Sequence, residues 1–212
     1  MSRVRIKFCG VTKIADALAA AECGADAIGL IFVPTSPRCL DVARATQITA
    51  ALPALVTRVA LFRDAESAEV RDVLNRVAID VLQFHGDESP EYCAQFGRPW
   101  LKAVAMGAIT EADALARYLD QHRAASGFVF DSHGGARSGG SGHAFDWSRL
   151  PRDRAKPLIL AGGLHPQNVR EAIIAVRPWA VDVSSGIESA PGIKDHAKMR
   201  AFADEVSRAR TD

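Results

Sequence analysis

Eight short apolar runs, spread along the whole chain, limit its possible folds more than any other feature. Most of these runs are separated by longer segments that are rich in alanine and charged residues and have helical character. Nearly continuous apolar runs are typical of strands that are buried on both faces of a parallel sheet. The expected strands are residues 5–8, 27–32, 58–62, 81–84, 100–104, 128–130, 158–160 and 181–183.

Eight successive βα units favour a closed (β/α)₈ barrel, or TIM barrel, of the α/β class. The 212 residues are somewhat fewer than the roughly 250 typical of such barrels. Because no low-complexity linker divides the chain, we expect residues 1–212 to form a single barrel domain. The alternative is an open Rossmann-like sheet. That fold calls for a G-x-G-x-x-G turn after the first strand, whereas Cys9-Gly10-Val11-Thr12 follows it here.

The charge balance and the cysteines limit which partners and which cellular compartment the sequence favours. The chain has 26 Lys and Arg against 25 Asp and Glu, so its formal net charge of +1 favours neither nucleic acid nor an acidic membrane surface as a partner. Four widely spaced cysteines without a C-x-x-C pair indicate free thiols in a reducing compartment. No apolar run approaches the roughly 18 residues of a spanning helix. We therefore expect a soluble, cytoplasmic protein.

Two reactive side chains stand where predicted strands end, which is the catalytic face of a parallel barrel. Cys9 follows the first strand and has Gly10 beside it, and Asp131 follows the sixth. A buried thiol is usually just a small apolar side chain, and that interpretation holds for Cys23 and Cys93. At a barrel mouth, however, a thiol and a carboxyl can supply the base and the acid of a proton transfer.

Small residues follow the seventh and eighth strands. They are Gly162 and Gly163 in the first loop and Ser184, Ser185 and Gly186 in the second. In barrels these two loops, with the N-terminus of a short extra helix, frequently bind phosphate through backbone N–H groups. The alternative is that the glycines only make tight turns. We favour the phosphate site, so the expected partner is a small phosphorylated molecule.

Three further polar residues are candidates for binding the rest of the substrate. Arg38 lies in a loop stiffened by two prolines and can present a bidentate fork to a carboxylate, although a solvent-exposed loop arginine is the simpler interpretation. Gln83 and His85 flank Phe84 at the end of the fourth strand, and strand alternation places them on one face. Three roles are open to His85: a polar side chain in the wall of the site, an acid, or a metal ligand.

Cofactor motifs are missing from the sequence. There is no H-E-x-x-H, no close Cys/His pair and no nicotinamide, flavin or nucleotide signature. We therefore expect neither a metal nor a cofactor, and chemistry by side chains alone. The glycine-rich stretch 134–142 follows the strand that carries Asp131, and it is consistent either with a loop that closes over substrate or with a plain solvated loop.

A set of motifs in order along nearly the whole chain resembles one family, the phosphoribosylanthranilate isomerases of tryptophan biosynthesis. The motifs are Lys7-Phe8-Cys9-Gly10-Val11-Thr12, Ser36-Pro37-Arg38, Gln83-Phe84-His85-Gly86-Asp87-Glu88, Gly139-Gly140-Ser141-Gly142 with Phe145-Asp146-Trp147, Ala161-Gly162-Gly163-Leu164, Asp182-Val183-Ser184-Ser185-Gly186-Ile187-Glu188 and Lys194-Asp195. Together they are highly specific.

The resemblance implies a small phosphosugar substrate and an Amadori rearrangement, of N-(5-phosphoribosyl)anthranilate to 1-(2-carboxyphenylamino)-1-deoxyribulose 5-phosphate, without a cofactor. By this resemblance Asp131 is the general acid that opens the furanose ring, Cys9 is the general base that removes the C2 proton, and Arg38 binds the anthranilate carboxylate. The chain departs from the family at His143, Ala144 and His165, where Lys-Thr and Asn are usual. The resemblance leaves open whether the protein is a monomer or a homodimer.

Two other functions are weighed against this one. The related phosphosugar isomerase of histidine biosynthesis uses an aspartate at the end of the first strand, and Cys9 at that position argues against it. A catalytically silent barrel that binds phosphorylated metabolites would keep the phosphate loops and lose the acid or the base. Both Cys9 and Asp131 are present, which argues against this function as well.

Overall fold

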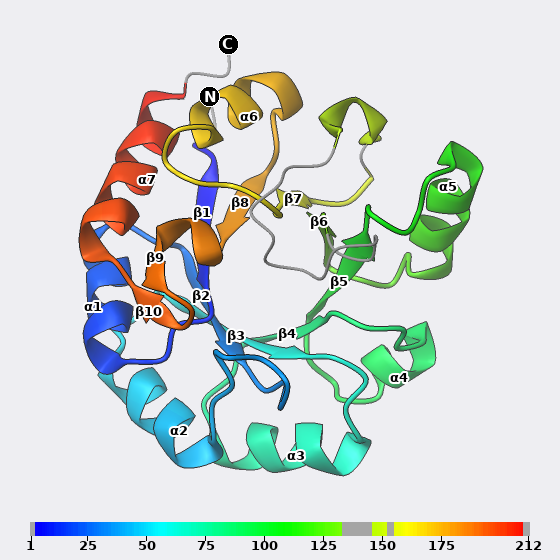
Figure 1. Ribbon diagram of the computed structural model, residues 1–212. Coiled ribbons are helices and arrows are strands. Elements are labelled where there is room, and N and C mark those ends of the chain that lie inside the picture. The colour runs from blue at the N-terminus through cyan, green and yellow to red at the C-terminus, as the bar shows by residue number, and fades with distance from the viewer. Residues whose placement is uncertain (1–2, 133–145, 152–154, 210–212) are drawn as a thin grey trace.

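Eight parallel strands form a closed barrel in the computed structural model of the chain, which describes residues 3–132, 146–151 and 155–209. Each strand pairs with the next in sequence, and β8 pairs with β1 to close the sheet (Figure 1). The strands are β1 (Arg5–Cys9), β2 (Ala27–Ile31), β3 (Thr57–Phe62), β4 (Val81–Phe84), β5 (Trp100–Ala105), β6 (Gly127–Asp131), β7 (Leu158–Leu160) and β8 (Ala180–Val183). All eight predicted strands are confirmed, and each end lies within one residue of its predicted position.

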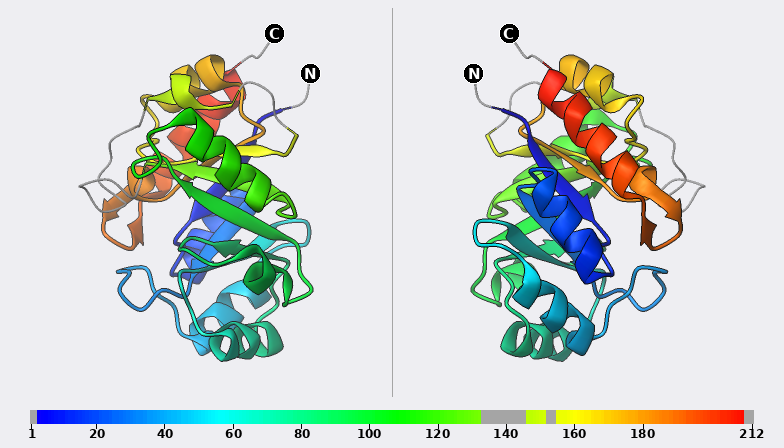
Figure 2. Two further views of the ribbon diagram at one scale, coloured as in Figure 1. Left: turned by 90° about the vertical axis from the view of Figure 1, so that its right-hand side faces the viewer. Right: turned by 90° about the vertical axis from the view of Figure 1, so that its left-hand side faces the viewer.

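Helices cover the outside of the barrel (Figures 1 and 2). Asp41 and Asp195 fix two helix starts, because their side chains accept hydrogen bonds from backbone N–H groups in the first turns of α2 and α7. None of the described helices is long and apolar enough to cross a membrane. The α-helices are α1 (Ile14–Glu22), α2 (Val42–Ala51), α3 (Ser67–Arg76), α4 (Pro90–Ala94), α5 (Ala112–Gln121), α6 (Val169–Val176) and α7 (His196–Arg208), and a 3₁₀ helix, η1 (Trp147–Arg149), lies between β6 and β7.

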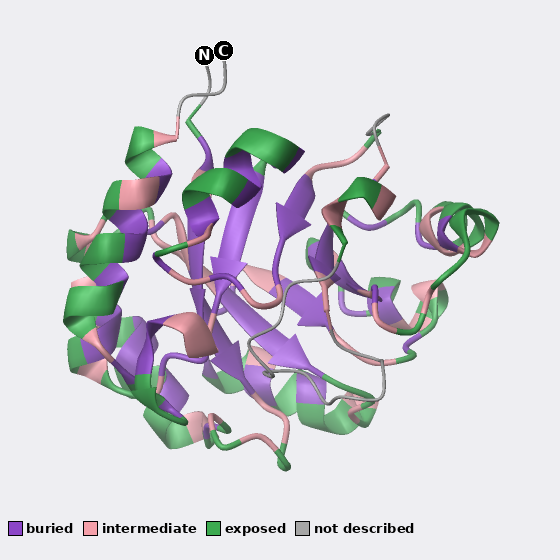
Figure 3. Cartoon of the chain, turned by 45° about the horizontal axis from the view of Figure 1, so that its top comes forward, coloured by how far each residue is buried: buried purple, intermediate pink, exposed green. Residues whose placement is uncertain are grey.

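The apolar core lies on both sides of the sheet, because alternate strand residues face opposite ways. The outward residues, which include Phe8, Leu30 and Phe84, pack beneath the helices in the main core. Figure 3 shows the strands buried along their length while the helices expose their outer faces. Each large apolar side chain buried there contributes about 1.5–3 kcal/mol. The inward residues form two smaller clusters, one of Val129, Ile159, Ala161 and Ala180 and one of Cys9, Ile31 and Leu61.

Two strands carry a buried lysine that is paired with a carboxylate. Lys7 of β1 faces the interior of the barrel, and its Nζ lies 2.6 Å from Oδ2 of Asp182. Lys102 of β5 faces the helices, and its Nζ lies 2.6 Å from Oε2 of Glu88. All four side chains are buried. Removing one partner of such a pair leaves an uncompensated buried charge, which typically costs about 3–5 kcal/mol.

An unexpected hairpin follows β8. The chain passes through a 3₁₀ helix, η2 (Ser185–Ile187), and then through β9 (Glu188–Ala190) and β10 (Ile193–Lys194), which pair antiparallel. Gly192 turns between them with a φ of +80°, a value that favours glycine. Figure 2 shows this hairpin and the loop after β2 projecting from the same face of the barrel. The predicted loop at residues 134–142 lies outside the described residues, as do His143 and Ala144.

Candidate active site

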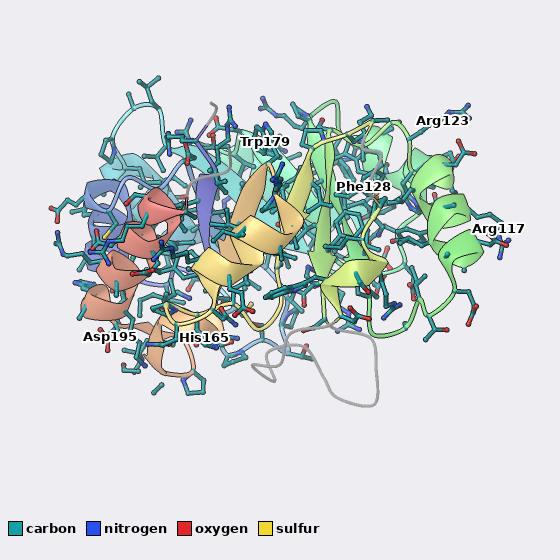
Figure 4. The ribbon with its side chains drawn as sticks, turned by 90° about the horizontal axis from the view of Figure 1, so that it is seen from above. Arg117, Arg123, Phe128, His165, Trp179 and Asp195 are labelled. Atoms are coloured by element: carbon teal, nitrogen blue, oxygen red, sulfur yellow. The ribbon has the colours of Figure 1, made fainter. Side chains whose placement is uncertain are left out.

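A cavity of about 400 Å³ opens where the barrel strands end. Figure 4 shows the barrel from the side, with its two ends apart. Trp179, just before β8, lies at the end where the strands begin, and His165 and Asp195 lie at the end where the strands finish. Gly186, a predicted phosphate-binding residue, does not line the cavity. A side chain there would overlap the carbonyl oxygen of Leu164, so this glycine lets η2 pack against the loop after β7. The other nine predicted site residues line the cavity: Cys9, Arg38, Gln83, His85, Asp131, Gly162, Gly163, Ser184 and Ser185.

Cys9 is the last residue of β1 and lines the cavity with a side chain that is almost fully buried. The neighbouring strand leaves room for the sulfur, because a Cβ at Gly29 would stand 2.6 Å from Cys9 Sγ. Burial raises the pKa of the Cys9 thiol; the charge of Lys7 lowers it, that of Asp182 raises it, and that of Lys194 lowers it. A thiolate at this position therefore depends on its cationic neighbours.

Asp131 ends β6 and is linked to the fourth strand through a histidine. Nε2 of His85 lies 3.8 Å from Oδ2 of Asp131, and Nε2 of Gln83 lies 3.2 Å from Nδ1 of His85. Gln83 and His85 lie on one side of the sheet, as strand alternation predicts. When the Gln83 amide donates to Nδ1, a neutral His85 ring carries its proton on Nε2 and presents it toward the carboxyl group of Asp131.

Arg38 forms a bidentate fork, but with a carboxylate of the protein. Its Nε and Nη2 each lie 2.7 Å from an oxygen of Glu188, which also accepts a hydrogen bond from Lys194 Nζ at 2.9 Å. Burial raises the pKa of Glu188, yet Arg38 and Lys194 outweigh it and hold the pKa below its usual value. Among the described residues no other acceptor engages the guanidinium, so its Nη1 edge remains for a ligand.

The stem of Arg38 reaches this position across the end of β1. Gly10 has a φ of +71°, and a side chain there would overlap Cδ of Arg38. Because Gly10 directly follows Cys9, one glycine provides both the tight turn after the strand and the space for the arginine stem.

Unpaired backbone donors gather in the loops after β7 and β8. Gly162 and Gly163 have φ values of +77° and +69°. Within residues 3–132, 146–151 and 155–209, the N–H groups of Gly162, Gly163, Ser184 and Ser185 donate no hydrogen bond. Lys194 Nζ bonds the carbonyl oxygen of Ser184 at 3.0 Å and adds positive charge nearby. Convergent N–H groups beside an ammonium group favour an anion such as phosphate.

Several charged residues of the site were not assigned a role from the sequence. Arg63 directly follows β3 and lines the cavity, a position that could have been recognised in the same way as that of Cys9. Lys7 and Asp182 are charged residues within apolar runs, and this interruption is the sequence signal that could have identified them. No group of three or more His, Cys, Asp or Glu side chains suited to a metal ion occurs in the part of the chain that the structure describes.

Comparison with known proteins identifies one family over nearly the full length. A family model described as N-(5'-phosphoribosyl)anthranilate (PRA) isomerase matches residues 6–205. N-(5'-phosphoribosyl)anthranilate isomerase of Acidithiobacillus ferrooxidans is 54% identical over 206 residues, which make up 97% of this chain and 98% of that protein.

Solved structures agree with this match. Phosphoribosyl anthranilate isomerase from Thermotoga maritima superposes with a TM-score of 0.87 at 39% identity, over 97% of this chain and 99% of that one. A phosphoribosyl anthranilate isomerase in complex with reduced 1-(o-carboxyphenylamino)-1-deoxyribulose 5-phosphate superposes with a TM-score of 0.80 at 36% identity, over the same shares of the two chains. The chain belongs to the N-(5'-phosphoribosyl)anthranilate isomerase family.

Proposed function

We propose that this protein converts N-(5-phosphoribosyl)anthranilate to 1-(2-carboxyphenylamino)-1-deoxyribulose 5-phosphate, a step of tryptophan biosynthesis, with Asp131 as the general acid and Cys9 as the general base. One observation carries the assignment: a thiol on β1 and a carboxyl group on β6 line a single cavity, whose lining also includes backbone N–H groups that donate no hydrogen bond in the described part of the chain. The similar protein solved with a reduced carboxyphenylamino-deoxyribulose phosphate supports the choice of substrate.

The proposed reaction needs only proton transfers. Asp131 protonates the furanose ring oxygen, the C1–O bond breaks, and the nitrogen lone pair forms a C1=N iminium. Cys9, as a thiolate, removes the C2 proton, and the electrons of that C–H bond form a C1=C2 bond. The π electrons of the C1=N bond return to nitrogen at the same time, which gives an enolamine. The enol then loses its hydroxyl proton while C1 gains a proton, which gives the ketone. The product is an isomer of the substrate, so no oxidant or reductant is required.

A fluorescence assay tests the assignment. Phosphoribosylanthranilate is fluorescent, and its signal should disappear when catalytic amounts of the protein are added. A barrel that only binds phosphorylated metabolites would leave the signal in place at substoichiometric protein. An enzyme specific for the histidine-pathway aminoaldose would turn over that compound and leave phosphoribosylanthranilate intact.

Arg38 is proposed to bind the anthranilate carboxylate through the Nη1 edge of its guanidinium. Arg38→Met should weaken binding of a non-phosphorylated anthranilate analogue by about 1.5–3 kcal/mol, the range for hydrogen bonds to charged groups, and leave phosphate binding unchanged. Isothermal titration calorimetry measures both affinities. Arg44→Met, an exposed substitution on α2, is the control. Equal affinities of wild type and Arg38→Met for the analogue would remove this role.

The loops after β7 and β8 are proposed to bind the substrate phosphate, so inorganic phosphate should bind there alone. Such binding stabilises the fold by about 2.7 kcal/mol at a concentration one hundred times the dissociation constant. The unfolding temperature should therefore rise more in phosphate than in chloride of matched ionic strength. Ser185→Asp should erase the excess, whereas Ser189→Asp, at an exposed position of β9, should keep it. An undiminished phosphate effect in Ser185→Asp would place the anion elsewhere.

A further inference from the structure

The ion pair inside the barrel has no part in the proton transfers proposed above. Lys7 precedes Cys9 by two residues on β1, so both side chains point into the barrel. Asp182 is the register partner of Lys7 on β8 and also lines the cavity. Lys7 and Asp182 are only 4% and 6% exposed. Because desolvating two charges costs several kcal/mol per ion, a pair at this position needs an explanation beyond stability.

The pair is incompletely satisfied, unlike the comparable pair on the outer face of the sheet. Glu88 accepts hydrogen bonds on both oxygens, from the backbone N–H groups of Asp64 and Gly86 and from Lys102 Nζ. Asp182 accepts from Lys7 on Oδ2, but its buried Oδ1 has no partner in the described part of the chain. Half of the Asp182 carboxylate is therefore left without a hydrogen-bond donor, in the cavity that Cys9 also lines.

Charged groups from four elements face Cys9. They are Lys7 on β1, Asp182 on β8, Lys194 on β10 and Arg38 in the loop after β2. Of these described groups, Lys7 alone lies on the same strand and the same face of the sheet as Cys9, and it also bonds the opposing carboxylate. Burial lowers the pKa of Lys7, but the charges of Asp182 and Cys9 outweigh it and raise that pKa above its usual value, so the ammonium stays charged. Burial raises the pKa of Asp182, Lys7 lowers it in part, and the charge of Asp131 raises it further, so that this pKa lies above its usual value.

We propose that Lys7 is a positioning residue that stabilises the thiolate of Cys9, and that Asp182 competes with the thiolate for the same ammonium and so limits how much thiolate is present. This inference rests on the proposed role of Cys9 as the base. It has a consequence that a purely structural ion pair lacks: removing the two partners moves the acidity of Cys9 in opposite directions.

The test follows alkylation of Cys9 by iodoacetamide as a function of pH, because only the thiolate reacts. Peptide mass spectrometry separates Cys9 from the other three cysteines. Lys7→Met should raise the midpoint of the alkylation profile by about one pH unit or more, a roughly tenfold lower rate below the midpoint. Asp182→Asn should lower the midpoint, because the amide keeps the shape of the carboxylate and removes its charge. Lys7→Arg, which keeps the charge, should stay closer to wild type than Lys7→Met.

Matched controls come from the second buried pair. Lys102→Met and Glu88→Gln remove equally buried partners on the outside of the sheet, and they should leave the Cys9 midpoint unchanged. Circular dichroism establishes that each variant is folded. Midpoints that move in the same direction in Lys7→Met and Asp182→Asn, or do not move, overturn the proposal. If Lys7→Met does not fold, Asp182→Asn alone tests the proposal, and a Cys9 midpoint that does not fall in this variant overturns it.

The alkylation assay needs no turnover, so the two proposals can fail separately. Absence of isomerase activity in the wild type, with the opposite midpoint shifts present, would overturn the proposed function and leave the role of Lys7 standing. Isomerase activity with unshifted midpoints would overturn the role of Lys7 and leave the proposed function standing.

Discussion

Cys9→Ala is expected to lower turnover by about 10²–10⁴-fold, the usual contribution of general acid–base catalysis, with little loss of substrate affinity. A general base acts on the transition state and contributes little to ground-state binding. Cys9→Ser should fare little better, because a hydroxyl group is a far weaker base than a thiolate. Steady-state loss of substrate fluorescence gives kcat, and titration with a reduced product analogue gives affinity.

Cys93→Ala is the matched control for this variant. Cys93 is also a buried thiol, but it lies in α4 within the outer core and away from the cavity. Its removal should leave kcat close to that of wild type. A Cys9→Ala enzyme that kept more than about a tenth of wild-type turnover would contradict the role of Cys9, given the usual size of acid–base contributions.

Asp131→Asn is expected to lower turnover by a comparable factor, again about 10²–10⁴-fold. The amide keeps the shape of the carboxyl group but has no acidic proton to give to the ring oxygen. Its kcat is measured by the same assay, and Asp120→Asn at an exposed position on α5 serves as the control. If Asp131→Asn were folded and as fast as wild type, the acid would lie elsewhere. His85, whose Nε2 lies 3.8 Å from Oδ2 of Asp131, would be tested next.

The strands could be predicted because their signal is local. A strand buried on both faces needs consecutive apolar residues, and a run such as Leu158–Leu160 carries that requirement within three positions. The ends of strands could be predicted for the same reason, which placed Cys9 and Asp131 at the cavity. The hairpin of β9 and β10 could not, because its strands are only three and two residues long and show no clear alternation.

The pairing of charges in the site could not be predicted, because the partners are far apart in the sequence. Arg38 and Glu188 are separated by 150 residues, and nothing near Arg38 shows that its fork is directed at a protein carboxylate. Lys7 and Asp182 are separated by 175 residues. Each interrupts an apolar run, and only the register of β1 against β8 shows that they face one another.

The pairing of β1 with β8 also determines when the site forms during folding. Loop-closure entropy must be overcome before contacts between distant parts of a chain can stabilise it, so such contacts tend to form late. During synthesis β1, with Lys7 and Cys9, emerges before the other seven barrel strands, and Asp182 and Lys194 emerge more than 170 residues later. Until then the ammonium of Lys7 has no carboxylate partner and β1 has an unpaired edge. Cys9 is thus made long before β8, and its electrostatic surroundings are completed only when that strand closes the barrel.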